Sequence, residues 1–245
     1  MKKLLVIFAL LAIGIVQAAT VHWTSGSPWG VGGDTDWDNS VNWIHNDWAT
    51  HAVPAADDTV YIDRYTAGNV GLLTTFDPTL SSVTPSFTIV VFSAQPAGPE
   101  INLSLINGAS LNAANLQLGA GVNATNTMYM SGNASATAGG LWVGVQPSAC
   151  SKIQMVDTST LTVNAGLFFT GVDSQILMDD SAKVSIPTVL VTDGWENTVI
   201  NAINAQKTIA RVDNGGTGWT EYSVVPEPAT FGLLAVLGLA FLRRK

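Results

Sequence analysis

The sequence predicts an all-β fold, a β-solenoid whose favoured form is a right-handed parallel β-helix, and three observations predict it. A unit of about 25 residues recurs between residues 101 and 186. Apolar and polar residues alternate within each unit. Asn, Gly, Asp and Ser punctuate the unit where turns are needed. Because one such unit cannot bury its inner face alone, stacked copies are expected to bury it together.

The repeat is visible when the chain is aligned with itself. The aligned pairs are residues 103–110 with 128–135, 116–119 with 141–144, Met128 with Ile153, Ile153 with Ile176, and Gly140-Leu141 with Gly166-Leu167. These pairs are offset by 25, 25, 25, 23 and 26 residues. We therefore expect solenoid repeats over residues 58–192, with Leu116, Leu141 and Leu167 in one inward row. A β-sandwich with accidental self-similarity is the alternative.

The alternation within each unit has the period of a β-strand. Leu161, Val163 and Ala165 are separated by polar residues, as are Ile153 and Met155. Successive side chains of a strand point to opposite faces, so this period predicts one buried and one polar face.

The first 18 residues are predicted to be a signal peptide. Lys2 and Lys3 precede an apolar run over residues 4–16, and Val16-Gln17-Ala18 is a small-residue site that a signal peptidase could cut before Ala19. A retained membrane helix is the alternative, although the run is short for a span. The remainder of the chain is then expected outside the cytoplasm.

The predicted exported part, residues 19–225, is acidic. It has five basic residues and 17 acidic ones, which are the 18 acids of the chain without Glu227, so its formal net charge is −12. Nucleic acid is an improbable partner for such a surface. An anionic polysaccharide would need a bridging divalent cation. Cys150 is the single cysteine, so no internal disulfide can form.

Residues 19–57 are predicted to be a tryptophan-rich N-terminal cap. Five of the eight tryptophans fall here: Trp23, Trp29, Trp37, Trp43 and Trp48. Their order, followed by Val53-Pro54 and Asp58-Thr59-Val60-Tyr61-Ile62, resembles the opening of repetitive β-helical surface proteins and autotransporter-associated repeats. We expect burial of these tryptophans over the first coil. Carbohydrate binding by Trp29, Trp37 and Trp48, through rings left exposed, is the alternative.

Asp34, Asp36 and Asp38 are candidate calcium ligands because their side-chain oxygens alternate along the chain. Position 6 of the loop is Asn39 instead of Gly, and position 12 is His45 where a bidentate Glu is expected. The segment is therefore not an EF-hand, and a turn with solvated carboxylates is the favoured interpretation. No other cofactor is predicted.

Asp157 and Asp180 are the only candidates for catalysis in the repeats. Each follows an aligned methionine by two residues, so they are expected to stack about 5 Å apart on neighbouring coils. Paired carboxylates serve glycoside hydrolysis, and β-helical lyases bind calcium through such groups. A lyase also needs a base, and Lys183 is the nearest in sequence. We favour a turn role for both residues.

Residues 193–224 are predicted to form a C-terminal cap of one helix and one hairpin. Asp193 and Glu196 have capping-box spacing, and Trp195, Val199, Ile200 and Ile203 form a stripe at helical spacing. The pattern of residues 208–212 and 219–224 predicts two strands joined by a Gly-rich turn. The cap is expected to cover the open end of the solenoid.

The tail, residues 225–245, has three parts. It begins with Val225, Pro226, Glu227 and Pro228, continues with an uncharged apolar stretch over 229–242, and ends with Arg243, Arg244 and Lys245. It resembles the PEP-CTERM sorting signal, which implies an exosortase-type enzyme of Gram-negative bacteria as partner. Fourteen residues make a helix of roughly 21 Å, short of the roughly 30 Å hydrocarbon core. A weakly held terminal membrane helix with its basic end in the cytoplasm is expected.

Three functions are consistent with these features. The leading one is a non-enzymatic surface or extracellular-matrix protein that passes through the inner membrane and associates with exopolysaccharide. The others are a carbohydrate-binding module that uses exposed tryptophans, and a β-helical polysaccharide lyase or glycoside hydrolase.

Overall fold

The computed structural model describes residues 18–24, 34–47, 49–63, 78–93, 100–123, 125–191, 199–204 and 207–225. Several predicted features lie outside these residues: positions 1–17 of the signal peptide, Trp29, Trp48, residues 193–198 of the cap, and tail residues 226–245 including Pro226, Glu227, Pro228, Arg243, Arg244 and Lys245. Within the described ranges, no helix is long and apolar enough to cross a membrane.

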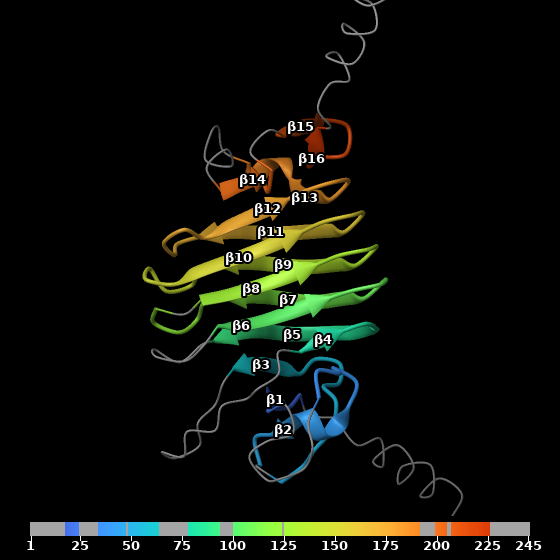
Figure 1. Cartoon of the computed structure of the whole chain (residues 1–245), viewed down its shortest axis with the longest axis vertical. Coiled ribbons are helices and arrows are strands. Elements are labelled where there is room, and N and C mark those ends of the chain that lie inside the picture. The colour runs from blue at the N-terminus through green and yellow to red at the C-terminus, as the bar shows by residue number, and fades with distance from the viewer. Residues whose placement is uncertain are drawn as a thin grey trace, which may run out of the picture.

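The protein is a β-solenoid in which the chain passes alternately through two sheets. The six-stranded sheet has the order β14 (Ile200–Ala202), β12 (Gln175–Met178), β10 (Cys150–Met155), β8 (Thr125–Met130), β6 (Ile101–Leu105) and β4 (Thr79–Leu80). The ten-stranded sheet has the order β15 (Thr208–Asn214), β16 (Trp219–Val225), β13 (Lys183–Pro187), β11 (Thr160–Phe169), β9 (Ser135–Val143), β7 (Ser110–Leu118), β5 (Val83–Ser93), β3 (Thr59–Asp63), β1 (Thr20–Trp23) and β2 (Trp43–His45). Figure 1 shows the coils stacked along the long axis.

Parallel pairing between successive coils confirms the predicted register of the repeat. Leu103 pairs with Met128, Met128 with Ile153, and Ile153 with Ile176. In the other sheet, Leu116 pairs with Leu141 and Leu141 with Leu167. Leu116 and Leu141 are buried, and Leu167 is partly buried against the core.

The core is one continuous apolar column inside the coils. Its central side chains are at most 1% exposed: Leu103, Leu105, Leu111, Leu116, Leu118, Met128, Met130, Leu141, Val143, Ile153, Met155, Leu161, Val163, Ile176, Met178, Val184 and Ile186. Each such side chain contributes roughly 1.5–3 kcal/mol when it is fully buried. With no disulfide available, this burial and the backbone pairing between coils stabilise the domain.

The long strands of the ten-stranded sheet change phase near their middle. In β7, Ala113 and Leu116 both point inward, while Ala114 and Asn115 between them lie outside. The pairing of β11 with β9 shifts register at the corresponding place, between Val163 and Gly166. The stretch of β11 between Val163 and Leu167 is therefore one residue longer than the matching stretch of β9 between Ala138 and Leu141.

The two ends of the solenoid are built differently from its coils. At the N-terminal end, β2 pairs antiparallel with β1, and the short 3-10 helix η1 (Ser40–Asn42) precedes it. At the C-terminal end, β15 and β16 form an antiparallel hairpin that pairs with β13, which confirms the predicted hairpin. A second 3-10 helix, η2 (Thr188–Leu190), follows β13.

The predicted helical stripe in the cap is wrong at Ile200. Ile200 lies in strand β14 and pairs with Ile176 of β12, so the six-stranded sheet gains one more rung. Ile203, predicted on the same apolar face, is 38% exposed. Backbone pairing with the edge of β12 satisfies groups that would otherwise be unpaired, which outweighs the helical spacing of a few apolar residues.

Candidate functional site

Three of the N-terminal tryptophans form a buried cluster. Trp23, Trp37 and Trp43 are 2%, 1% and 0% exposed. The ring of Trp43 lies edge-on to both others, with centroids 5.0 Å from Trp23 and 4.6 Å from Trp37. Its indole N–H donates to the Trp37 carbonyl at 2.7 Å. Predicted burial is confirmed for these three residues. Because Trp37 is buried, it cannot stack on a sugar, and the alternative that this residue binds carbohydrate is wrong.

The acidic segment beside this cluster is a series of turns closed by its own carboxylates. The backbone N–H of Asp36 donates to Asp34 at 2.9 Å, and that of Asp38 donates to Asp36 at 3.0 Å. Hydrogen bonds from the amide groups of Asn42 and Asn39 lower the pKa of Asp34. Across the described residues, no three His, Cys, Asp or Glu side chains are grouped to hold a metal ion. Calcium binding by these residues stays a prediction.

Asp157 and Asp180 occupy equivalent turns, as the favoured interpretation predicts. Both have positive φ values, 58° and 53°, a conformation that Asp tolerates better than most residues. The Asp157 carboxylate accepts a hydrogen bond of 2.7 Å from the backbone N–H of Gly132 in the preceding coil. This hydrogen bond therefore links the turns of two neighbouring coils.

Sequence reasoning missed the base that lies beside these acids. Lys207 donates a hydrogen bond to Asp179 and lies 3.7 Å from the nearest oxygen of Asp180. This hydrogen bond lowers the pKa of Asp179 and raises that of Lys207. Lys207 precedes β15, and Asp179 lies in the turn between β12 and β13. Their contact therefore holds the C-terminal hairpin against the last coil.

The outer face of the ten-stranded sheet is free of charge at its centre. Strands β5, β7, β9 and β11 contain no Asp, Glu, Lys or Arg, although the chain has 18 acidic and 10 basic residues. The six-stranded sheet, in contrast, has Lys152 in β10. Hydroxyl and amide side chains therefore provide the polar character of this face.

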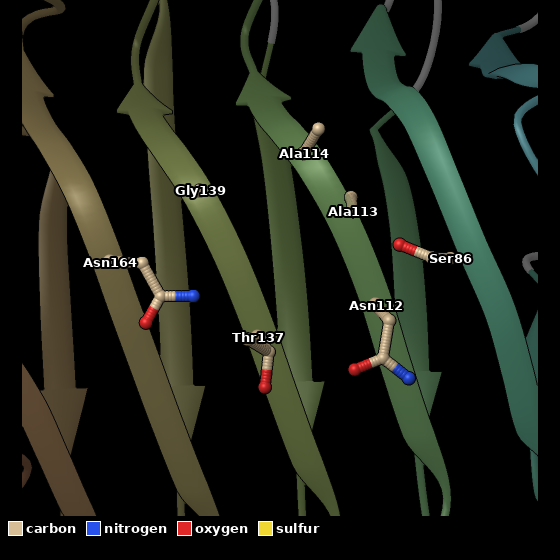
Figure 2. Close-up of a pocket in the computed structure, with 7 residues that line it drawn as sticks. All are labelled: Ser86, Asn112, Ala113, Ala114, Thr137, Gly139 and Asn164. Carbon is tan, nitrogen blue, oxygen red and sulfur yellow. The ribbon is translucent and has the colours of Figure 1, made fainter.

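A hollow of about 390 Å³ lies on this face (Figure 2). Its lining is made of small and polar residues: Ser86, Asn112, Ala113, Ala114, Thr137, Gly139 and Asn164. Ser86, Asn112 and Thr137 are paired across β5, β7 and β9, so three polar side chains follow one another at the spacing of the coils. A Cβ at Gly139 would clash with the Ala114 carbonyl oxygen, which explains the glycine there.

The hollow can exchange hydrogen bonds with an uncharged polar ligand. Thr137 and Asn164 make no side-chain hydrogen bond to another described residue, whereas the side-chain amide of Asn112 donates a hydrogen bond of 3.3 Å to the Thr84 carbonyl. Hydroxyl and amide groups both donate and accept hydrogen bonds. The lining residues carry hydroxyl and amide groups and no charged side chain.

Comparisons with protein-family models, with curated proteins and with solved structures give no match.

Proposed function

We propose that this protein is an exported, non-enzymatic cell-surface or extracellular-matrix protein of a Gram-negative bacterium that associates with exopolysaccharide. In this proposal the chain is cut by signal peptidase, held briefly in the inner membrane by its tail and released by an exosortase-type enzyme. The coils form a right-handed scaffold. The observation that carries the proposed association is the charge-free face of β5, β7, β9 and β11, whose hydroxyl and amide groups match the hydrogen bonding of a polysaccharide.

The first test concerns sorting. Replacing Pro226, Glu227 and Pro228 by alanines is expected to leave the chain in the inner membrane, whereas the unaltered chain reaches the surface or medium without residues 229–245. Cell fractionation and mass spectrometry of the C-terminus measure this. Surface-located protein that keeps an intact tail would overturn the sorting proposal.

The second test concerns association. The exported protein is expected to sediment with exopolysaccharide from the producing cells and to be freed when that polymer is enzymatically degraded. Protein that stays freely soluble in the presence of the intact polymer would contradict the association.

The third test separates this proposal from a β-helical lyase or hydrolase. The purified protein is expected to release no sugars from pectin, alginate or cellulose, and Asp157→Asn together with Asp180→Asn is expected to leave this result unchanged. Turnover that is abolished by Asp157→Asn would show that the protein is an enzyme.

A further inference from the structure

One column of paired residues crosses six strands of the ten-stranded sheet and includes four aromatic rings, two at each end. The paired residues are, in order along the solenoid, His22, Tyr61, Val91, Gln117, Trp142 and Phe168. His22, at the N-terminal end, is 8% exposed, whereas Phe168 at the other end is 46% exposed. The column therefore opens to solvent at Phe168.

Trp142 and Phe168 form a stacked pair whose geometry depends on two glycines. The two ring centroids are 5.0 Å apart, and the ring planes differ by 19°. Gly140 and Gly166 precede these residues by two positions, on the same face of the same strands. A Cβ at Gly140 would clash with the Trp142 ring, and one at Gly166 would lie 2.8 Å from the Phe168 ring. Each ring thus leans over a glycine of its own strand.

Phe168 is only partly covered by its described neighbours. Trp142 covers the face towards β9. On the other side, β13 pairs with β11 only at Thr160–Thr162, and the 3-10 helix η2 comes next to β11 in place of a further paired strand. Phe168 nevertheless remains 46% exposed, so the stack with Trp142 leaves about half of its surface open to solvent.

The surroundings of this ring favour a neutral sugar. The central strands carry no charge, and residues 19–225 have a formal net charge of −12, so an anionic polymer would be repelled. Asn164 of the polar hollow lies on β11 four residues before Phe168, at most about 13 Å away at about 3.3 Å per residue. A flat apolar platform near fixed amide and hydroxyl groups fits a ligand with both apolar C–H faces and hydroxyl groups.

We propose that the Phe168–Trp142 stack and the hollow around Asn164 form a binding site for a neutral glycan chain. An apolar sugar face lies against Phe168, and hydroxyl groups of the same glycan reach Asn164 and Thr137. This site gives a location and a ligand class to the polysaccharide association proposed above, and it rests on that proposal.

Binding of the full exported protein to neutral glucan, neutral mannan and a polyuronate, measured by affinity electrophoresis, tests this site. We expect at least one neutral polymer to retard the protein and the polyuronate not to do so. Phe168→Ala is expected to weaken binding by about tenfold or more, and Asn164→Ala to weaken it less. Tyr129→Ala is the matched control, because Tyr129 is a 40% exposed aromatic residue on the six-stranded sheet. Unfolding curves of each variant exclude loss of the fold.

The possible outcomes separate the site from the wider function. Binding to a neutral polymer that is equal in Phe168→Ala and the unaltered protein would overturn the site and leave the association intact. Preference for the polyuronate would overturn the predicted ligand class. Absence of binding to all three polymers, together with a dimer that Phe168→Ala makes monomeric, would show that a second copy of the chain covers this face and would overturn the glycan site.

Discussion

Tryptophan side chains occur in two different settings in this solenoid. Trp23, Trp37 and Trp43 pack edge-on against one another at the N-terminal end and are at most 2% exposed. Trp142 lies on the outer face of β9 and stacks face to face with Phe168, which is 46% exposed. The first group closes the end of a core, and the second forms a surface that nothing in the described chain covers completely.

The buried tryptophan cluster and the Trp142–Phe168 pair differ in the residues that surround them. The buried tryptophans fill the N-terminal end of the core, where the described residues form no further coil, and the Trp43 indole N–H donates a hydrogen bond to the Trp37 carbonyl. Trp142 and Phe168 instead need glycines beside them, Gly140 and Gly166, which leave room for the rings on the surface. Aromatic content alone therefore does not distinguish a buried cap from an exposed stacked pair.

The largest expected effect is at the inward position next to Trp142. Leu141→Asp would bury an unpaired charge in the 0% exposed core row, and we expect it to unfold the domain. Thr162→Asp on the outer face is expected to change the free energy of unfolding by less than about 1 kcal/mol. Circular dichroism and urea unfolding measure both. Equal tolerance of the two changes would contradict the register of the coils.

Removing one ring from each aromatic group tests the comparison itself. Trp43→Ala is expected to lower the free energy of unfolding by about 3–5 kcal/mol, because it opens a cavity in a fully buried cluster. Trp142→Ala removes a partly exposed ring, and its expected cost is about 1 kcal/mol. If urea unfolding gives the two variants the same loss, the division into a buried cap and an exposed platform is wrong.

Substituting the glycine beneath the Trp142 ring is expected to have a smaller effect on stability than Trp43→Ala. Gly140→Ala would push a methyl group into the Trp142 ring, with an expected cost of about 1–3 kcal/mol and a changed near-ultraviolet circular dichroism signal. Gly215→Ala is the control, since no atom lies within 4 Å of a Cβ built there. An unchanged aromatic signal in Gly140→Ala would show that the ring does not lean over this glycine.

The smallest expected effect is the acid sensitivity of the N-terminal end of the solenoid. Hydrogen bonds from Thr50 lower the pKa of Asp47 to about 2, and those from Asn42 and Asn39 lower that of Asp34. A carboxyl group whose pKa is lowered by folding stabilises the protein above its unfolded pKa of about 3.9, and this contribution is lost as the pH falls through the folded value.

The thermal unfolding temperature should therefore decrease as the pH is lowered from about 4 to about 2, and Asp47→Asn should make this decrease smaller. Thermal unfolding at a series of pH values measures the difference. The same decline in the variant and in the unaltered protein would show that Asp47 does not contribute.

The repeat register could be predicted because each inward apolar residue fixes the side of the sheet on which its strand packs. A one-residue slip at Leu116 or Leu141 would expose the whole inner row, so the 25-residue offset was sufficient. The helix around Ile200 could not be excluded, since a few apolar residues fit both helical and strand spacing. The open edge of β12, which the sequence does not display, decided between them.

The candidate site was harder to predict than the fold. The recurrence of Gly-Leu followed by an aromatic residue, at Trp142 and Phe168, was present in the sequence. Its exposure depends on where the following coil stops pairing with β11, and that is a tertiary property. The contact of Lys207 with Asp179 likewise joins residues 28 positions apart and depends on how the cap folds back.

The most direct test of the account is hydroxyl-radical footprinting of the folded exported protein with and without a neutral polysaccharide. We expect Trp142 and Phe168 to be modified rapidly, Trp23, Trp37 and Trp43 to be protected, and the neutral polymer to protect Trp142 and Phe168 but not Tyr129. Modification of Trp37 and Trp43 at the rate of Trp142, or no protection of Phe168 by a polymer that binds the protein, would contradict the account.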